Sequence, residues 1–74
     1  MPEFEVTMGG YDIKDVDRVV ALVEAVRNNE TISTKEDAVR ALTSRKAETF
    51  PRRFRGYSKI QVRNYIEDRL RELA

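Results

Sequence analysis

Apolar residues recur at helical spacing in the first third of the chain. They lie three or four positions apart and form one stripe: Val16, Val19, Val20, Val23 and Val26. This spacing is typical of an amphipathic helix. Asp12 stands before the stripe as a good N-cap, and Asn28-Asn29 follows it as a plausible end. We therefore expect a helix over residues 13–27.

Two further stretches show the same periodicity. Ser33 and Glu36 predict a capping box, and a narrower apolar face follows that consists of Ala38, Val39, Ala41 and Leu42. Pro51 excludes a regular helix across it, so a second helix is expected over residues 33–47. Ser58 is a candidate N-cap for a third helix over residues 59–73. The stripe of this third helix comprises Val62, Tyr65, Ile66, Leu70 and Leu73.

The segments that lead into the first and third helices resemble each other when the chain is aligned on itself with an offset of 46. Identical residues at matching positions are Phe4 and Phe50, Gly10 and Gly56, Tyr11 and Tyr57, and Val16 and Val62. Met8 matches Phe54, and both are large and apolar. A glycine before a helix allows a close backbone approach, and the tyrosine after it can fold onto the helix stripe.

The repeat predicts the architecture of the chain. We expect an all-α fold in a single domain over residues 1–74, in which two hook-plus-helix units, 4–27 and 50–74, are joined by the helix at 33–47. The second helix can return the chain to its start, so the two hooks are expected to meet, with Tyr11 and Tyr57 in equivalent places. The apolar stripes of the first and third helices are then expected to face each other. A homodimer in which each hook pairs with its twin is the competing arrangement, which the small size of the domain also favours.

Composition argues against an enzyme. The chain of 74 residues contains no histidine and no cysteine, so it lacks the commonest general base and metal ligand as well as thiolate chemistry. No phosphate-binding or calcium-binding loop is present, and no cofactor or metal is expected. The acidic N-terminus lacks a signal-peptide core, and no apolar run would span a bilayer. We expect a cytoplasmic protein.

Charge is distributed unevenly behind the net value of +1. Residues 1–37 carry nine acids and four bases, whereas residues 38–74 carry ten bases and four acids. Such an asymmetry of charge favours attraction between the two halves of the chain, or binding of an anionic partner to the basic half. The basic residues are densest around an aromatic side chain, in Arg52, Arg53, Phe54 and Arg55.

This basic segment is the candidate binding hook. In one interpretation Phe54 enters an anionic membrane interface while the arginines meet lipid phosphates. In the other, Phe54 belongs to the core and the arginines are merely solvated. Nucleic acid is a rival partner for the same patch, because arginines contact phosphates. The acidic first half and the lack of a base-reading motif make this partner the weaker alternative, in a small nucleic-acid-binding or regulatory protein.

The second hook resembles a known family. The pattern formed by Phe50, Phe54-Arg55-Gly56-Tyr57 and Val62 is similar to the start of the DivIVA domain. Ser58 stands where that domain usually has Asp. The first copy keeps Gly10-Tyr11-Asp12 and Val16 but has Met8-Gly9 where the family has Phe-Arg. The resemblance is to small proteins with tandem DivIVA-like repeats, and this chain lacks the long coiled coil of the larger members.

The resemblance implies a function. It predicts a non-enzymatic adaptor or scaffold in bacterial cell division, polar growth or envelope organisation. Its expected partners are a larger DivIVA-like or division protein and an anionic membrane surface, which the family touches with the Phe-Arg pair matching Phe54-Arg55. The expected location is the cytoplasm, with peripheral placement at the membrane, pole or septum. Two identical hooks pair in the family dimer, and here one chain would imitate that pairing.

Overall fold

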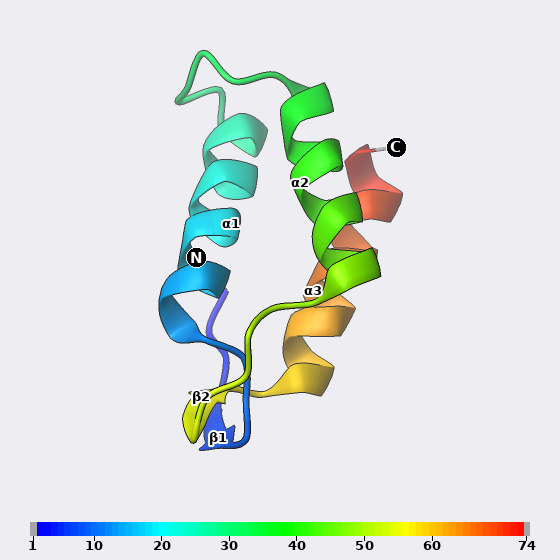
Figure 1. Ribbon diagram of the computed structural model, residues 1–74. Coiled ribbons are helices and arrows are strands. Elements are labelled where there is room, and N and C mark those ends of the chain that lie inside the picture. Colours follow the sequence, from blue (N-terminus) through cyan, green and yellow to red (C-terminus); the bar gives the residue numbers. More distant parts are fainter. Residues whose placement is uncertain (1, 74) are drawn as a thin grey trace.

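The computed structural model describes residues 2–73 as three helices and one small sheet (Figure 1). The elements follow the order β1 (Val6–Met8), α1 (Ile13–Arg27), α2 (Lys35–Glu48), β2 (Arg55–Tyr57) and α3 (Lys59–Leu73). The sheet lies at one end of the helices, and the loop between α1 and α2 lies at the other (Figure 1). The fold is mostly helical, but the expectation of an all-α protein is wrong because the two hooks pair as strands.

Helix α1 has the predicted bounds and cap. The Asp12 carboxylate accepts a hydrogen bond from the Asp15 amide at 3.1 Å, which satisfies one of the free amides at the helix start. Beyond the C-cap at Asn28, Asn29 adopts a left-handed φ of 56°. Asparagine tolerates this conformation better than most residues do, so the local sequence explains where α1 ends.

Helix α2 spans Lys35–Glu48 where the sequence predicts 33–47, and its N-cap lies one residue later than expected. Thr34, not Ser33, is the N-cap, and its hydroxyl accepts from the Asp37 amide at 3.2 Å. The Asp37 carboxylate accepts in return from the Thr34 amide at 3.0 Å. The sequence offers two overlapping capping boxes, and the one that is used starts a helix in which Ala38 and Leu42 are fully buried.

A single core lies between the three helices. Its buried apolar members are Tyr11, Val16, Val20, Val23, Ala38, Leu42, Phe50, Val62, Tyr65, Ile66 and Leu73. We expected the stripes of α1 and α3 to face each other directly. Instead α2 packs against both of these helices and contributes Ala38 and Leu42 to the space between them. The middle helix is therefore part of the core and not only a connection.

The two hooks cross and pair through their backbones. Strands β1 and β2 are antiparallel, with Val6 opposite Tyr57 and Met8 opposite Arg55. Beyond the strands, Tyr11 and Tyr57 exchange two backbone hydrogen bonds, each of 2.9 Å. The Asp12 amide donates to the Pro51 carbonyl at 2.8 Å, and the Ser58 amide donates to the Glu5 carbonyl at the same distance. These four bonds form two matched pairs. Within each pair, one bond becomes the other when its first-hook residue is moved forward by 46 positions and its second-hook residue back by 46.

Two glycines lie where the hooks cross. A Cβ atom on Gly56 would lie 2.2 Å from the Tyr11 carbonyl oxygen and 2.6 Å from the Gly10 carbonyl carbon. A Cβ atom on Gly10 would lie 2.4 Å from the carbonyl carbon of Gly56. Both contacts are with backbone atoms, so the neighbouring atoms cannot rotate away. The crossing therefore requires glycine at both positions.

Candidate functional site

Two large apolar side chains project from the paired hooks. Met8 is 76% exposed and Phe54 is 75% exposed. The sequence left open whether Phe54 lies in the core or at the surface. In the structure it lies outside the core. The Gly9 amide donates to the Phe54 carbonyl at 2.9 Å, so this exposed segment is fixed by backbone bonds across the hooks. We call the surface formed by Met8, Phe54 and the arginines at 52, 53 and 55 the hook tip.

The three arginines of the hook tip differ in their contacts. Arg53 donates from Nε to Asp12 Oδ2 at 2.6 Å, and this bond lowers the pKa of the Asp12 carboxyl. Arg52 donates from Nε to the Gly9 carbonyl oxygen at 3.2 Å. Arg55 is exposed and makes no ion pair within residues 2–73. The positive charge of the tip is therefore only partly neutralised.

A shallow depression beside Phe54 completes this surface. It is lined by Phe54 with Arg53 and Arg55 from the second hook, and by Asp12, Ile13 and Lys14 at the start of α1. Three basic side chains surround one exposed aromatic ring there. An anionic surface with an apolar layer beneath it, or an acidic protein segment carrying an apolar residue, matches this chemistry.

The other motif residues serve the hook structure. Tyr11 and Phe50 are buried with ring centroids 5.6 Å apart, and Phe4 and Tyr57 lie partly buried at 5.2 Å. These two aromatic pairs are again related by a shift of 46 residues. Val16 and Val62 are each 1% exposed in the core. The conserved spacing within the chain thus corresponds to equivalent packing in the two hooks.

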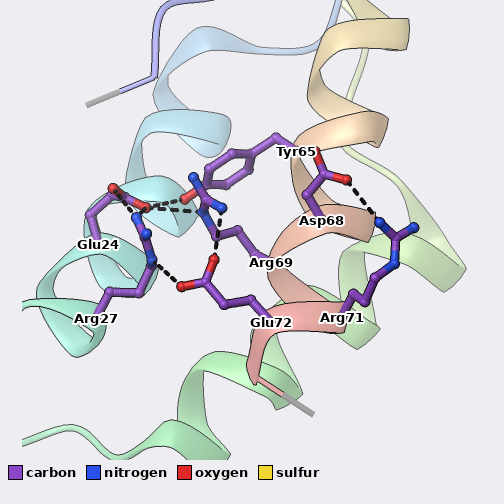
Figure 2. A network of polar contacts seen from close by, with 7 residues as sticks. All are labelled: Glu24, Arg27, Tyr65, Asp68, Arg69, Arg71 and Glu72. Atoms are coloured by element: carbon purple, nitrogen blue, oxygen red, sulfur yellow. Dashed lines mark hydrogen bonds and ion pairs between the residues drawn. The ribbon is translucent and has the colours of Figure 1, made fainter.

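A polar network between α1 and α3 was missed by the sequence reasoning (Figure 2). Glu24 Oε2 accepts from the Tyr65 hydroxyl at 2.8 Å, and Glu24 Oε1 lies 2.9 Å from Arg27 Nη1. Glu72 Oε1 accepts from Arg27 Nε at 2.8 Å, and Glu72 Oε2 accepts from Arg69 Nη1 at 3.0 Å. Arg69 Nε is buried and lies 3.5 Å from Glu24 Oε2. The local signals were the three-residue spacings of Glu24 with Arg27 and of Arg69 with Glu72.

The network shifts the pKa values of its members in defined directions. Burial raises the pKa of Glu24, but the hydrogen bonds from Tyr65 and Arg27 outweigh it, and the net pKa is lowered. The hydrogen bond from Arg27 lowers the pKa of Glu72. Burial, together with the bond to Glu24, raises the pKa of the Tyr65 hydroxyl. At neutral pH the carboxylates are therefore charged and Tyr65 is the donor.

Acid is expected to destabilise the fold through these groups. Glu24, Glu72 and Asp12 all have lowered folded-state pKa values, so their contribution to stability is present above their unfolded pKa values of about 4. It is lost as the pH falls through the folded values. We expect a Tm that is nearly constant between about pH 7 and 5 and falls below about pH 4.5, measured by circular dichroism. A Tm that stays level down to pH 3 would contradict this coupling.

The described residues contain no group of three or more acidic, histidine or cysteine side chains placed to hold a metal ion. Between residues 2 and 73 no helix is both long and apolar enough to cross a membrane. No family model, curated protein or solved structure matches the chain. The resemblance to DivIVA thus stays a prediction that depends on the hook residues themselves.

Proposed function

We propose that this protein is a non-enzymatic adaptor of the DivIVA-like type, acting in bacterial cell division, polar growth or envelope organisation. The observation that supports the proposal is the hook tip, where Met8 and Phe54 are exposed beside three arginines. Apolar side chains that are this exposed lower the solubility of a protein. When they lie together on hydrogen-bonded backbone, next to positive charge, they are typical of a contact surface. The matched bonds of the two hooks support the further proposal that the chain is a tandem repeat imitating a symmetric pair.

The tip suits an anionic membrane surface. Phe54 would enter the interface while Arg55, Arg53 and Lys14 remain at the level of the phosphates. Each basic residue near such a surface contributes about 1 kcal/mol, and one small apolar contact adds little more, so single binding is weak. Stable placement at a pole or septum then requires several copies or a protein partner, such as a larger DivIVA-like protein, which raises the avidity.

Vesicle binding tests the tip directly. The double variant Phe54→Ala and Arg55→Ala should bind vesicles containing anionic lipid at least about 10-fold more weakly than the wild type, because it loses the aromatic anchor and one of the free charges. Co-sedimentation with vesicles of phosphatidylglycerol and phosphatidylcholine at low salt measures the effect. The proposal also predicts a fluorescent fusion concentrated at poles or septa, and an even cytoplasmic distribution would count against it.

A matched control separates the tip from general surface properties. Ile32 and Arg71 are also exposed but lie away from the hooks, so Ile32→Ala with Arg71→Ala should bind like the wild type. If both double variants lose binding equally, the contact is a non-specific charge effect. Titration with duplex DNA at two salt concentrations completes the test, since salt-sensitive binding there without vesicle binding would favour the rival nucleic-acid function.

A further inference from the structure

The hydroxyl groups of two tyrosines in equivalent places have different partners. Tyr57 donates from its hydroxyl to Asp17 Oδ1 at 2.8 Å, and this bond raises the pKa of Tyr57. The repeat offset of 46 residues relates Tyr57 to Tyr11 and Asp17 to Arg63. The position on the third helix that corresponds to Asp17 is thus occupied by Arg63, which lines the same cavity as Tyr11. A guanidinium has no acceptor, so it cannot replace Asp17.

The Tyr11 hydroxyl has no hydrogen-bond partner among residues 2–73. The residue as a whole is only 5% exposed. The other two tyrosines both donate to carboxylates, since Tyr65 donates to Glu24 and Tyr57 to Asp17. The Tyr11 hydroxyl oxygen is not among the fully buried polar atoms that lack a partner, so it is accessible from solvent. A ligand that brings an acceptor can therefore reach it.

A cavity of about 140 Å³ adjoins the Tyr11 side chain. Tyr11 and Phe50 of the hooks, Arg45 and Lys46 of α2, and Arg63 and Glu67 of α3 contribute to its lining. Its three bases outnumber its one acid. Within the described chain none of these four charged groups is in an ion pair, so their charges are available to a ligand.

One of these bases is held in place. Arg45 lies over the Phe50 ring at 4.9 Å from the centroid and donates from Nη1 to the Thr49 carbonyl oxygen at 3.2 Å. A cation placed in this way keeps its position without a counter-ion from the chain. The cavity thus combines a hydroxyl donor, one guanidinium held in place and two further basic side chains.

We propose that this cavity binds a carboxylate group, which accepts the Tyr11 hydroxyl hydrogen as Asp17 accepts that of Tyr57. Arg63 and Lys46 supply the opposite charge, and the Phe50 and Ile66 side chains contact the short apolar stem. The volume equals that of about four or five waters, which admits a carboxylate on a two- or three-carbon stem. The source is either a small free acid or an Asp or Glu side chain of a partner protein. This site is separate from the hook tip and does not depend on the proposed function.

Binding of acetate to the full chain tests the site. Backbone amide NMR titrations with sodium acetate, compared with sodium chloride at equal ionic strength, should show saturable shifts around Tyr11, Arg45 and Arg63. Tyr11→Phe and Arg63→Gln should each weaken binding about 10-fold, since each removes a bond to the charged group. Tyr57→Phe is the matched control and should leave acetate binding unchanged. Glu67→Gln should bind acetate more tightly, because it removes the only acid of the cavity.

The two ligand sources are separated by a second titration. A capped dipeptide containing Asp should bind more tightly than acetate if the natural ligand is a protein side chain, and no more tightly if it is a small acid. Shifts no larger with acetate than with chloride would overturn the proposal, as would a Tyr11→Phe variant that binds like the wild type. Neither result would affect vesicle binding by the hook tip.

A pair of isosteric variants checks the geometry without any ligand. Arg63→Asp and Arg63→Asn both remove the guanidinium, but only aspartate recreates the carboxylate that Tyr57 has on the other side. Arg63→Asp should therefore have the higher Tm of the two and should no longer respond to acetate. An equal or lower Tm for Arg63→Asp would contradict the predicted approach of residue 63 to the Tyr11 hydroxyl.

Discussion

Replacing Gly56 by alanine is expected to abolish cooperative folding. The added Cβ atom would lie 2.2 Å from the Tyr11 carbonyl oxygen, well inside van der Waals contact. Relief requires the hooks to separate, which breaks the paired Tyr11–Tyr57 hydrogen bonds and the sheet. Overpacking costs about 1–3 kcal/mol where side chains can adjust, and more where only backbone atoms are in the way. A domain of this length has only about 4–11 kcal/mol of stability to lose.

Gly9 provides the control for this substitution. It has a positive φ of 72°, but the nearest atom to an added Cβ would be Arg52 Nη2 at 3.5 Å, which is an ordinary contact. Gly9→Ala should therefore cost only the conformational penalty of about 1–2 kcal/mol. Urea unfolding followed by circular dichroism compares the two variants. If Gly56→Ala unfolds at the same urea concentration as Gly9→Ala, the hooks do not cross as described.

Removing the Glu24 carboxylate should produce the second largest loss. Its side chain is only 15% exposed, and it accepts from the Tyr65 hydroxyl and from Arg27. Glu24→Ala also removes the carboxylate that lies 3.5 Å from the buried Arg69 Nε, an atom without a hydrogen-bond partner among residues 2–73. Breaking a buried charge pair by removing one partner typically costs about 3–5 kcal/mol. We expect a loss of about 3 kcal/mol in the free energy of unfolding, because Arg27 and Arg69 still pair with Glu72. The loss is measured as the change in the urea midpoint multiplied by the slope of the unfolding free energy against urea concentration.

Asp68 is the matched surface carboxylate for this prediction. It pairs with Arg71 at 3.5 Å, but both side chains are more than half exposed, at 61% and 78%. Exposed pairs of this kind contribute about 0–1 kcal/mol, so Asp68→Ala should be nearly neutral. A Glu24→Ala variant as stable as Asp68→Ala would show that the network in Figure 2 does not connect α1 to α3.

The helices could be predicted because their signals are local. The valine stripe and Asp12 define α1, and Ser58, whose hydroxyl accepts from the Gln61 amide at 3.5 Å, stands before α3. The N-cap of α2 was misplaced by one residue because Ser33 and Thr34 are both good caps. The structure uses Thr34, whose side chain and amide both bond to Asp37.

The sheet and the polar network could not be predicted in the same way. Strands β1 and β2 have three residues each, too few for an alternating pattern, and each exists because its backbone groups need the other hook. Glu24 and Arg69 lie beside the apolar stripes, where charged residues are usually solvated. Their pairing depends on the distance between α1 and α3, which the middle helix sets. The exposure of Phe54 likewise follows from the crossing and has no counterpart in the local sequence.

The crossing of the hooks also determines when the protein can fold. Val6 pairs with Tyr57, so the first strand has no partner until residue 57 has left the ribosome. Contacts between residues so distant in sequence slow folding, because the loop between them must close first. Until then Phe4, Tyr11 and the valines of α1 lack most of their apolar neighbours, and the nascent chain is exposed to chaperones and proteases. Truncation before β2 should therefore yield an unfolded first half and not a smaller functional module.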